Sequence, residues 1–141
     1  MLYYDTKTGK RLWQAINADP SIGETVPAAP IAWDGMVYVG QAGGDYKRVK
    51  GRFYALDAKT GKVRWKRKAP GRISGAATVV GDIVYFGDLQ SRSTTGLSAR
   101  SGRTVFRFRR GGFNPVVSDG RNLYVVGYAS LSQLRPRSAG R

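Results

Sequence analysis

The side chains that could carry out chemistry in this chain are carboxylates and amines, because it contains no cysteine and no histidine. That composition excludes thiol nucleophiles, Ser-His-Asp triads, Cys/His zinc sites and disulfides. Nine Asp and Glu stand against 24 Lys and Arg, which gives a formal charge of +15. Such a charge attracts anionic surfaces and polymers. We therefore look for a carboxylate that could hold a cation and for Lys and Arg that could hold an anion.

Most of the carboxylates occur in turns that repeat along the chain. Residues 5–13 (DTKTGKRLW) return 52 residues later as residues 57–65 (DAKTGKVRW), and residues 98–106 (SARSGRTVF) form an eroded third copy. An Asp followed by Thr and Gly is typical of a tight turn whose carboxylate accepts backbone N–H groups. The turn residues to which we assign structural roles are Asp5, Gly9, Asp57, Thr60 and Gly61.

A second element alternates with this turn. Residues 26–40 (VPAAPIAWDGMVYVG) overlay residues 73–87 (ISGAATVVGDIVYFG) without a gap, and residues 114–127 (NPVVSDGRNLYVVG) are a looser third version. Each contains two apolar or β-branched runs around a turn that tolerates positive φ, which predicts a β-hairpin. The turn dipeptides are Asp34-Gly35, Gly81-Asp82 and Asp119-Gly120.

Joining the two elements gives a unit of four short strands and about 40 to 50 residues, which is the period of a propeller blade. We therefore predict an all-β fold, a partial β-propeller of four-stranded antiparallel blades. The predicted parts are a half-blade at 1–16, complete blades at 26–68 and 73–110, and a half-blade with a tail at 113–141. The half-blades are expected to be complementary, so that two copies could complete one another's blades.

Large aromatic residues recur eight positions after the repeated Asp or Ser. Trp13, Trp65 and Phe106 fall on the predicted outermost strand of each blade. A residue that recurs once per blade is typical of packing between blades, and a large ring can cover that gap. The alternative is that the tryptophans stack on a cofactor.

The segment at 53–65 (FYALDAKTGKVRW) is close to the repeat consensus of the PQQ-binding-like β-propellers, and the resemblance covers nearly the whole chain. That family includes quinoprotein alcohol dehydrogenases, an outer-membrane assembly lipoprotein and sensor domains. The resemblance implies a cell-envelope or otherwise extracytoplasmic location. Residues 127–131 (GYASL) resemble the carboxyl-terminal end of such propellers, so the chain is expected to be a carboxyl-terminal fragment, and it begins without a signal-peptide pattern.

Residues 41–51 (QAGGDYKRVKG) contain six residues more than the equivalent turn of the next unit. Loops that differ between repeats often carry specificity. The segment is similar to a loop of quinoprotein dehydrogenases, which implies that Asp45 would ligate calcium and Lys50 would meet a PQQ carboxylate. It departs from that loop in having Asp for Glu, Lys for Arg and one more residue before Gly51. The alternative is a glycine-rich, basic surface loop without a cofactor.

The predicted outer strands carry much of the positive charge, at 64–68 (RWKRK) and 103–110 (RTVFRFRR). Lys and Arg on an exposed edge strand prevent edge-to-edge pairing. The excess charge also favours an anionic polymer or membrane surface as partner. We expect no nucleic-acid partner, because no nucleic-acid-binding module is present.

From these features we expect a non-catalytic binding or scaffold segment of an envelope propeller, acting through its basic rim and loops on a protein or an anionic polymer. We expect no catalytic residues and no cofactor. The alternative is a fragment of a PQQ-dependent dehydrogenase, with PQQ and calcium, and a third hypothesis is a truncated chain with no activity of its own. In each case, further blades or self-association are needed to close a ring.

Overall fold

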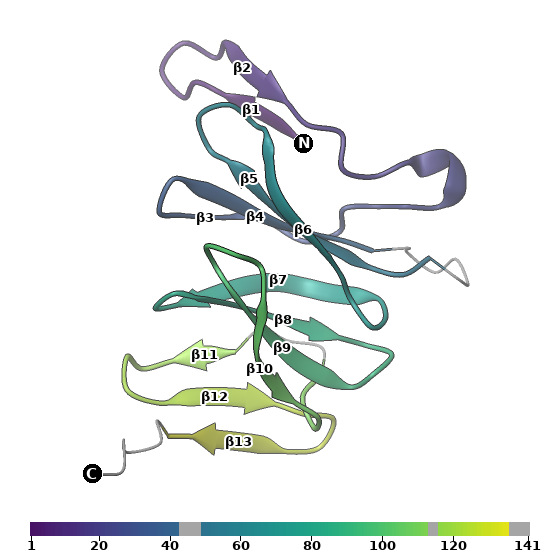
Figure 1. Ribbon diagram of the computed structural model, residues 1–141, viewed down its shortest axis with the longest axis vertical. Helices are drawn as coiled ribbons and strands as arrows, with labels where there is room; N and C mark the ends of the chain where they lie inside the picture. The colour runs from purple at the N-terminus through teal and green to yellow at the C-terminus, as the bar shows by residue number, and fades with distance from the viewer. Residues whose placement is uncertain (43–48, 113–115, 136–141) are drawn as a thin grey trace.

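The computed structural model describes residues 1–42, 49–112 and 116–135. Over these ranges the chain forms thirteen β-strands and one short 3-10 helix, in four antiparallel sheets. The sheets follow one another in chain order along the long axis of the molecule (Figure 1). This arrangement confirms the prediction of an all-β partial propeller built from four-stranded units.

Within each sheet, strands that are consecutive in the sequence are hydrogen-bonded neighbours. The first sheet contains β1 (Leu2–Tyr4) and β2 (Arg11–Gln14), and the second contains β3 (Ile31–Trp33), β4 (Met36–Gln41), β5 (Arg52–Asp57) and β6 (Val63–Lys68). The third contains β7 (Ile73–Val80), β8 (Ile83–Asp88), β9 (Ser93–Ser98) and β10 (Thr104–Phe108). The fourth contains β11 (Val117–Ser118), β12 (Leu123–Val126) and β13 (Leu131–Leu134), and the 3-10 helix η1 (Pro20–Ile22) lies between β2 and β3.

Each predicted hairpin turn contains a glycine with positive φ. Trp33 pairs with Met36 across the two-residue turn, and Asp34 and Gly35 have φ of 47° and 71°. Positive φ at both central residues gives the backbone twist that matches the twist of the flanking strands. In the third sheet Val80 pairs with Ile83 in the same way.

The two central strands of each complete sheet are buried on both faces. In β4, Tyr38 packs toward the third sheet, whereas Val37 and Val39 pack with Trp13 of the first sheet. Successive side chains of a strand point to opposite faces, so one strand serves both interfaces. This is why the central strands appear in the sequence as continuous apolar runs and not as an alternation.

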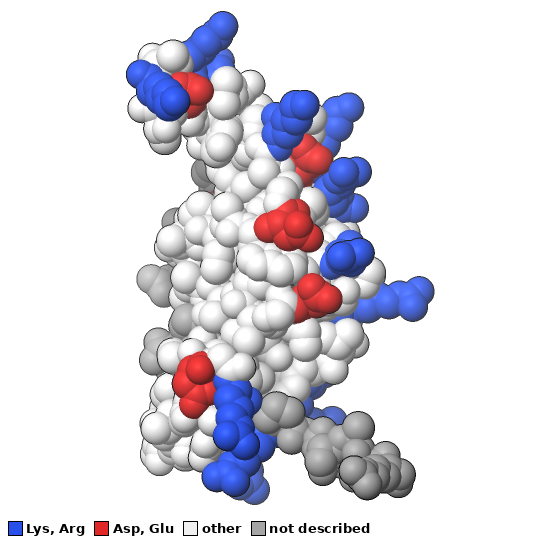
Figure 2. Space-filling view, turned by 90° about the vertical axis from the view of Figure 1, so that its left-hand side faces the viewer, with Lys and Arg blue, Asp and Glu red and all other residues white. Residues whose placement is uncertain are grey.

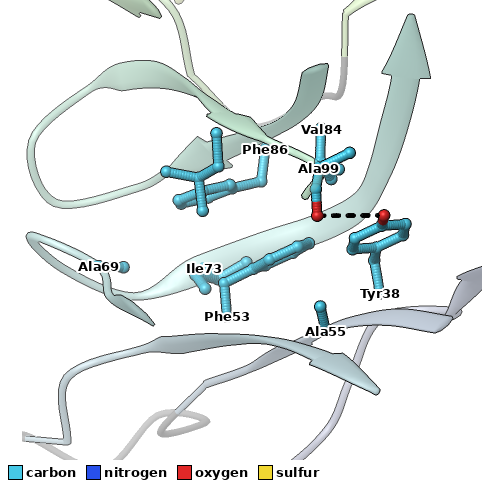
Figure 3. Close-up of a cluster of buried hydrophobic side chains, with 9 residues drawn as sticks. Tyr38, Phe53, Ala55, Ala69, Ile73, Val84, Phe86 and Ala99 are labelled. Carbon is cyan, nitrogen blue, oxygen red and sulfur yellow. Dashed lines mark hydrogen bonds between the residues drawn. The ribbon is translucent and has the colours of Figure 1, made fainter. Parts of the chain in front are cut away.

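The largest core cluster lies between the second and third sheets (Figure 3). The rings of Phe53 and Phe86 stack there with centroids 4.8 Å apart and planes 9° apart. The Tyr38 hydroxyl donates to the Ala99 carbonyl at 3.4 Å, so its one polar atom has a partner. Stacked aromatic pairs of this kind contribute about 0.5 to 1.5 kcal/mol beyond the area that they bury.

The repeated turns are held by their acidic residue. The Asp5 carboxylate accepts from the amides of Lys7 and Thr8 and from the Thr8 hydroxyl, at 2.8 to 2.9 Å. The Asp57 carboxylate makes the same three contacts one repeat later, with Lys59 and Thr60. These hydrogen bonds lower the pKa of both carboxyl groups, because they favour the charged form.

Each tryptophan of an outer strand docks on the turn of the following sheet. The indole N–H of Trp13 donates to the Ala58 carbonyl at 2.9 Å, and that of Trp65 donates to the Ala99 carbonyl at 2.8 Å. The turn glycine lies directly under the ring. A Cβ on Gly61 would come within 2.7 Å of the Trp13 ring, and one on Gly102 within 2.7 Å of the Trp65 ring.

The ends of the repeat differ from its middle. Gly9 occupies the same turn position as Gly61, with φ of 68°, but an added Cβ would find nothing within 4 Å. Phe106, at the third aromatic position, has no indole N–H and instead meets Tyr85 edge to face at 5.5 Å. The docking contact therefore runs from the first sheet to the second and from the second to the third.

Candidate functional site

The segment at 41–51 begins at the end of β4 and ends at the start of β5. The β8–β9 and β12–β13 turns lie on the same side of the molecule as the end of β4 and the start of β5, at the right of Figure 1. We call this side the loop face. Loops that converge on one face of a rigid scaffold are a common place for binding residues.

Of the two predicted cofactor residues, Asp45 lies outside the described residues. Lys50 is exposed. The next residue, Gly51, is buried: its amide donates to the Gly71 carbonyl at 2.9 Å, and its carbonyl accepts from Ala69 at 2.9 Å. A Cβ on Gly51 would come within 2.8 Å of the Gly71 oxygen. The far end of the segment is therefore fixed to the link between the second and third sheets.

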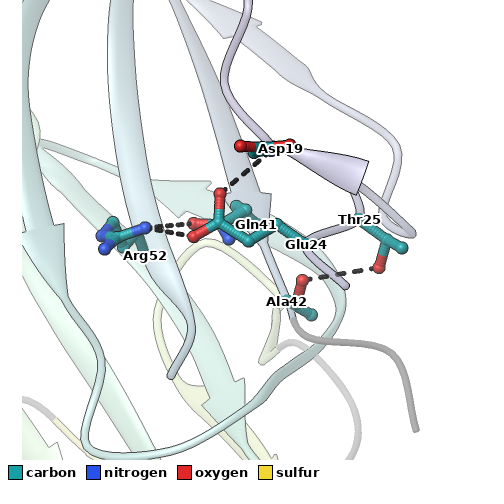
Figure 4. Close-up of polar contacts among 6 residues, drawn as sticks. All are labelled: Asp19, Glu24, Thr25, Gln41, Ala42 and Arg52. Atoms are coloured by element: carbon teal, nitrogen blue, oxygen red, sulfur yellow. Dashed lines mark hydrogen bonds and ion pairs between the residues drawn. The ribbon is translucent and has the colours of Figure 1, made fainter. Parts of the chain in front are cut away.

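A polar network that sequence reasoning missed lies beside this segment (Figure 4). Arg52 donates to the Glu24 carboxylate at 2.5 Å and to the Gln41 side-chain oxygen at 3.5 Å. The Asp19 amide donates to the other Glu24 oxygen at 3.0 Å. Glu24 and Gln41 are buried, whereas the Arg52 side chain is 37% exposed. The network ties the link between β2 and β3 to the two strands that carry the segment.

The ionisation of Glu24 follows from these contacts. Burial by itself raises the pKa of a carboxyl group. The hydrogen bonds from the Asp19 amide and from Arg52, together with the charge of Arg52, outweigh burial and hold the pKa of Glu24 below its ordinary value. Glu24 is therefore ionised at neutral pH and is paired within the chain.

The third sheet also contains a buried acid, but at a different position from Glu24. Asp88 stands where Gln41 stands in the second sheet, and it is fully buried. Its carboxylate accepts from the amides of Gly71 at 2.6 Å and of Gln90 and Ser91 at 2.9 Å. A side chain on Gly71, the counterpart of Glu24, would collide with Gln90. Glu24 therefore lies in the link between β2 and β3, whereas Asp88 lies at the end of β8.

These carboxylates do not form a metal or quinone site. Calcium takes about six to eight oxygen ligands. Glu24 and Asp88 are both occupied by hydrogen bonds from their own chain. Within the described ranges, no three acidic residues lie close enough together to hold a metal ion. The described carboxylates of the loop face therefore do not supply a calcium site.

A second candidate surface is the outer edge of the sheets. Arg64, Lys66 and Lys68 are exposed on β6, and Arg107 is exposed on β10. We call these four residues the basic edge. Arg64 pairs with Asp57 at 3.2 Å. In Figure 2 the Lys and Arg side chains gather mainly along the right-hand side and at the two ends of the molecule.

Arg67 of β6 contacts the third sheet and is not part of the basic edge. Arg67 donates through Nε to the Gly102 carbonyl at 2.7 Å, next to the Trp65 ring that covers the same turn. The sequence shows it only as one basic residue in a basic run. The only signal for Glu24 is that it is the single glutamate of the chain, without a counterpart in the repeat.

No helix in the described part of the chain is long and apolar enough to span a membrane.

The four-stranded units, the repeated Asp turns and the docked tryptophans define a quinoprotein-like β-propeller. The model of the family described as outer membrane protein assembly factor BamB matches residues 2–135. The chain belongs to this family of PQQ-like propeller repeats.

Curated relatives include enzymes. The chain is 43% identical over 61 residues to a lanthanide-dependent methanol dehydrogenase of Methylacidiphilum fumariolicum, a match that covers 43% of this chain and 10% of the relative. It is 36% identical over 66 residues to the quinohemoprotein alcohol dehydrogenase ADH IIB of Pseudomonas putida, covering 47% and 9%. The chain thus spans about a tenth of the length of these relatives.

Solved structures give the same fold. BamB of Moraxella catarrhalis superposes with a TM-score of 0.70 at 25% identity, over 90% of this chain and 37% of that protein. A europium-containing methanol dehydrogenase superposes with a TM-score of 0.71 at 19% identity, over 89% and 34%. An outer membrane protein assembly factor and dehydrogenases are therefore both similar to this chain.

Proposed function

We propose that the chain is a non-catalytic binding and scaffold segment of a cell-envelope propeller, with the basic edge as the surface that meets its partner. The observation that supports this most is the row of exposed Arg64, Lys66 and Lys68 on one strand. Alternate residues of a strand share a face, so these three charges lie together. An anionic polymer or the acidic surface of a protein would complement them.

The hydrogen bonding of the buried Glu24 and Asp88 supports the same proposal. A metal-dependent dehydrogenase site needs carboxylate oxygens that are free to bind the cation. On the loop face, Glu24 and Asp88 are held by hydrogen bonds within the chain. The similarity to BamB of Moraxella catarrhalis, a structure that this chain matches over 90% of its length, agrees with a scaffold role in the envelope.

Binding to a teichoic-type polymer and to double-stranded DNA at matched salt tests the proposal. We expect the polymer to bind in preference to DNA, and the Lys66→Gln/Lys68→Gln variant to bind it about tenfold more weakly, because two phosphate contacts are lost. A Lys7→Gln/Lys10→Gln variant removes the same net charge from the exposed turn of the first sheet. Equal loss in both variants would show that net charge alone, and not the basic edge, is responsible.

The second candidate function is a fragment of a PQQ-dependent dehydrogenase. It is favoured by the 43% identity to a lanthanide-dependent methanol dehydrogenase over 61 residues. In that case Asp45 and Lys50 would contribute to the cation and quinone site. Added PQQ and calcium would then change the absorption spectrum and raise the melting temperature.

The Asp45→Ala variant separates the two functions. The scaffold proposal predicts that unfolding free energy changes by less than about 0.5 kcal/mol with or without calcium, as for an ordinary surface substitution. A calcium-dependent rise in melting temperature that disappears in the variant would establish the enzyme alternative. The measurement is thermal unfolding with calcium and with a chelator.

A further inference from the structure

A cationic pocket lies on the loop face, between the third and fourth sheets. It has a volume of about 340 Å³, within the range of small-molecule sites. Arg92 from the β8–β9 turn lines it, Arg109 and Arg110 line it just after β10, and Tyr128 lines it from the β12–β13 turn. Three segments that are distant in the sequence thus meet around one hollow.

The charge of this pocket is not neutralised within the described part of the chain. Its described lining includes three arginines and no carboxylate. The ion pairs found among the described residues involve Arg52 and Arg64 and none of the pocket arginines. Three guanidinium groups around one hollow repel one another, and a bound anion relieves that repulsion.

The backbone around the pocket is fixed without a ligand. Arg92 has φ of 49°, in the left-handed region, and its guanidinium lies 4.8 Å from the centre of the Tyr128 ring. The amide of Gly127 donates to the Ser130 carbonyl at 2.8 Å, and a side chain on Gly127 would collide with the Arg110 carbonyl. The backbone that carries Arg92 and Arg110 is therefore positioned by the fold, whereas the arginine side chains are exposed.

The number of arginines indicates the kind of anion. A carboxylate presents two oxygens in one plane, and a single guanidinium fork satisfies both. A phosphoryl group presents three terminal oxygens in different directions and up to two negative charges, so it can be met from several sides. The guanidinium of Arg92 lies over the Tyr128 ring, and this cation–π contact helps to orient it.

We propose that this pocket binds the phosphoryl group of a small phosphate ester of the glycerol phosphate type. The same phosphomonoester group occurs in soluble esters and in the headgroup of phosphatidic acid. This site is separate from the basic edge, and it does not depend on the function proposed above.

Calorimetric titration of the full chain with glycerol 3-phosphate, with inorganic phosphate and with phosphatidic acid vesicles tests the proposal. We expect the Arg92→Gln/Arg110→Gln variant to bind at least tenfold more weakly than the unchanged chain. The control is Arg100→Gln/Arg103→Gln, which removes the same charge from exposed positions between β9 and β10, outside both the described lining and the basic edge. Circular dichroism of each variant checks that the sheets are retained.

Binding of the soluble ester that is lost in the pocket variant and kept in the control supports the proposal and identifies a soluble ligand. Binding of vesicles alone, with the same pattern, supports it and identifies a lipid headgroup. Absence of binding to all three probes, or equal weakening in pocket and control variants, overturns it.

Discussion

At the scale of single residues, the packing of Trp13 depends on Gly61, because the ring occupies the space that a side chain at position 61 would need. Gly61→Ala places a methyl group within 2.7 Å of the Trp13 ring, at a φ of 72°. We expect a loss of about 3 kcal/mol in unfolding free energy, from left-handed strain and from overpacking. Gly81→Ala is the matched control, because it has φ of 57° but nothing within 4 Å. Urea unfolding should show a loss of only about 1 kcal/mol there.

Glu24 gives a prediction about pH. Its pKa is lower in the folded chain than in the unfolded one, so its ionised form stabilises the fold at pH values above the unfolded pKa of about 4.3. That stabilisation is lost as pH falls through the folded pKa. We expect Glu24→Gln to cost about 1 to 2 kcal/mol at neutral pH, because a charged hydrogen bond to Arg52 is lost. The difference from the unchanged chain should shrink below about pH 4, and a difference that grows on acidification would contradict this account.

A double-mutant cycle separates the interaction energy of the Glu24–Arg52 pair from the other effects of each substitution. Arg52→Gln removes the same ion pair from the other side, and the Arg52 side chain is 37% exposed. If the pair carries the effect, the double variant should cost little more than either single one. Additive losses would show that the two residues stabilise the chain independently.

At the scale of elements, the packing of one sheet on the next can be tested through Trp65. Trp65→Ala removes the ring that covers the turn at Gly102 and should cost about 3 to 5 kcal/mol. Trp65→Phe keeps most of the ring and loses the hydrogen bond to Ala99, so it should cost about 1 kcal/mol. An alanine variant that melts like the unchanged chain would show that the contact is dispensable.

The sequence predicted the elements well because they repeat. Local turn chemistry, Asp34-Gly35 for a hairpin and Asp57 with Thr60 for the tight turn, is enough to place strands without knowledge of the fold. The Glu24 to Arg52 pair could not be predicted, because its members are 28 residues apart and have no counterpart in the next repeat. Likewise, three arginines meet in one pocket only once the third and fourth sheets have packed.

At the scale of the whole molecule, the strand count limits how copies can join. The first sheet has two strands, and the fourth has three among the described residues. These two sheets together have more strands than the four of one blade. If one copy is to complete the blade of another, as expected from the sequence, a strand must therefore be displaced. The end sheets also expose apolar side chains, among them Leu2, Tyr3, Val117 and Leu131.

We therefore expect the isolated chain to self-associate, because exposed apolar surface and unpaired strand edges favour contacts between copies. Light scattering at micromolar concentration should give a mass above that of one chain. The mass should fall when Leu2 and Tyr3 are replaced by Ser. A monomer that unfolds cooperatively at the same concentration would contradict this prediction.

The docking of Trp13 on Gly61 and of Trp65 on Gly102 also has a direction, and direction restricts symmetry. The first and second sheets each contribute an indole to the sheet after them, and the second and third sheets each offer a glycine turn to the sheet before them. Two molecules that use this contact must therefore present different surfaces to each other, so it cannot form a dimer with twofold symmetry. A repeated contact between unlike surfaces either closes into a ring or continues as an open filament, according to the rotation from one sheet to the next. The turn at Gly9 is the equivalent surface of the first sheet, where an added Cβ would find nothing within 4 Å.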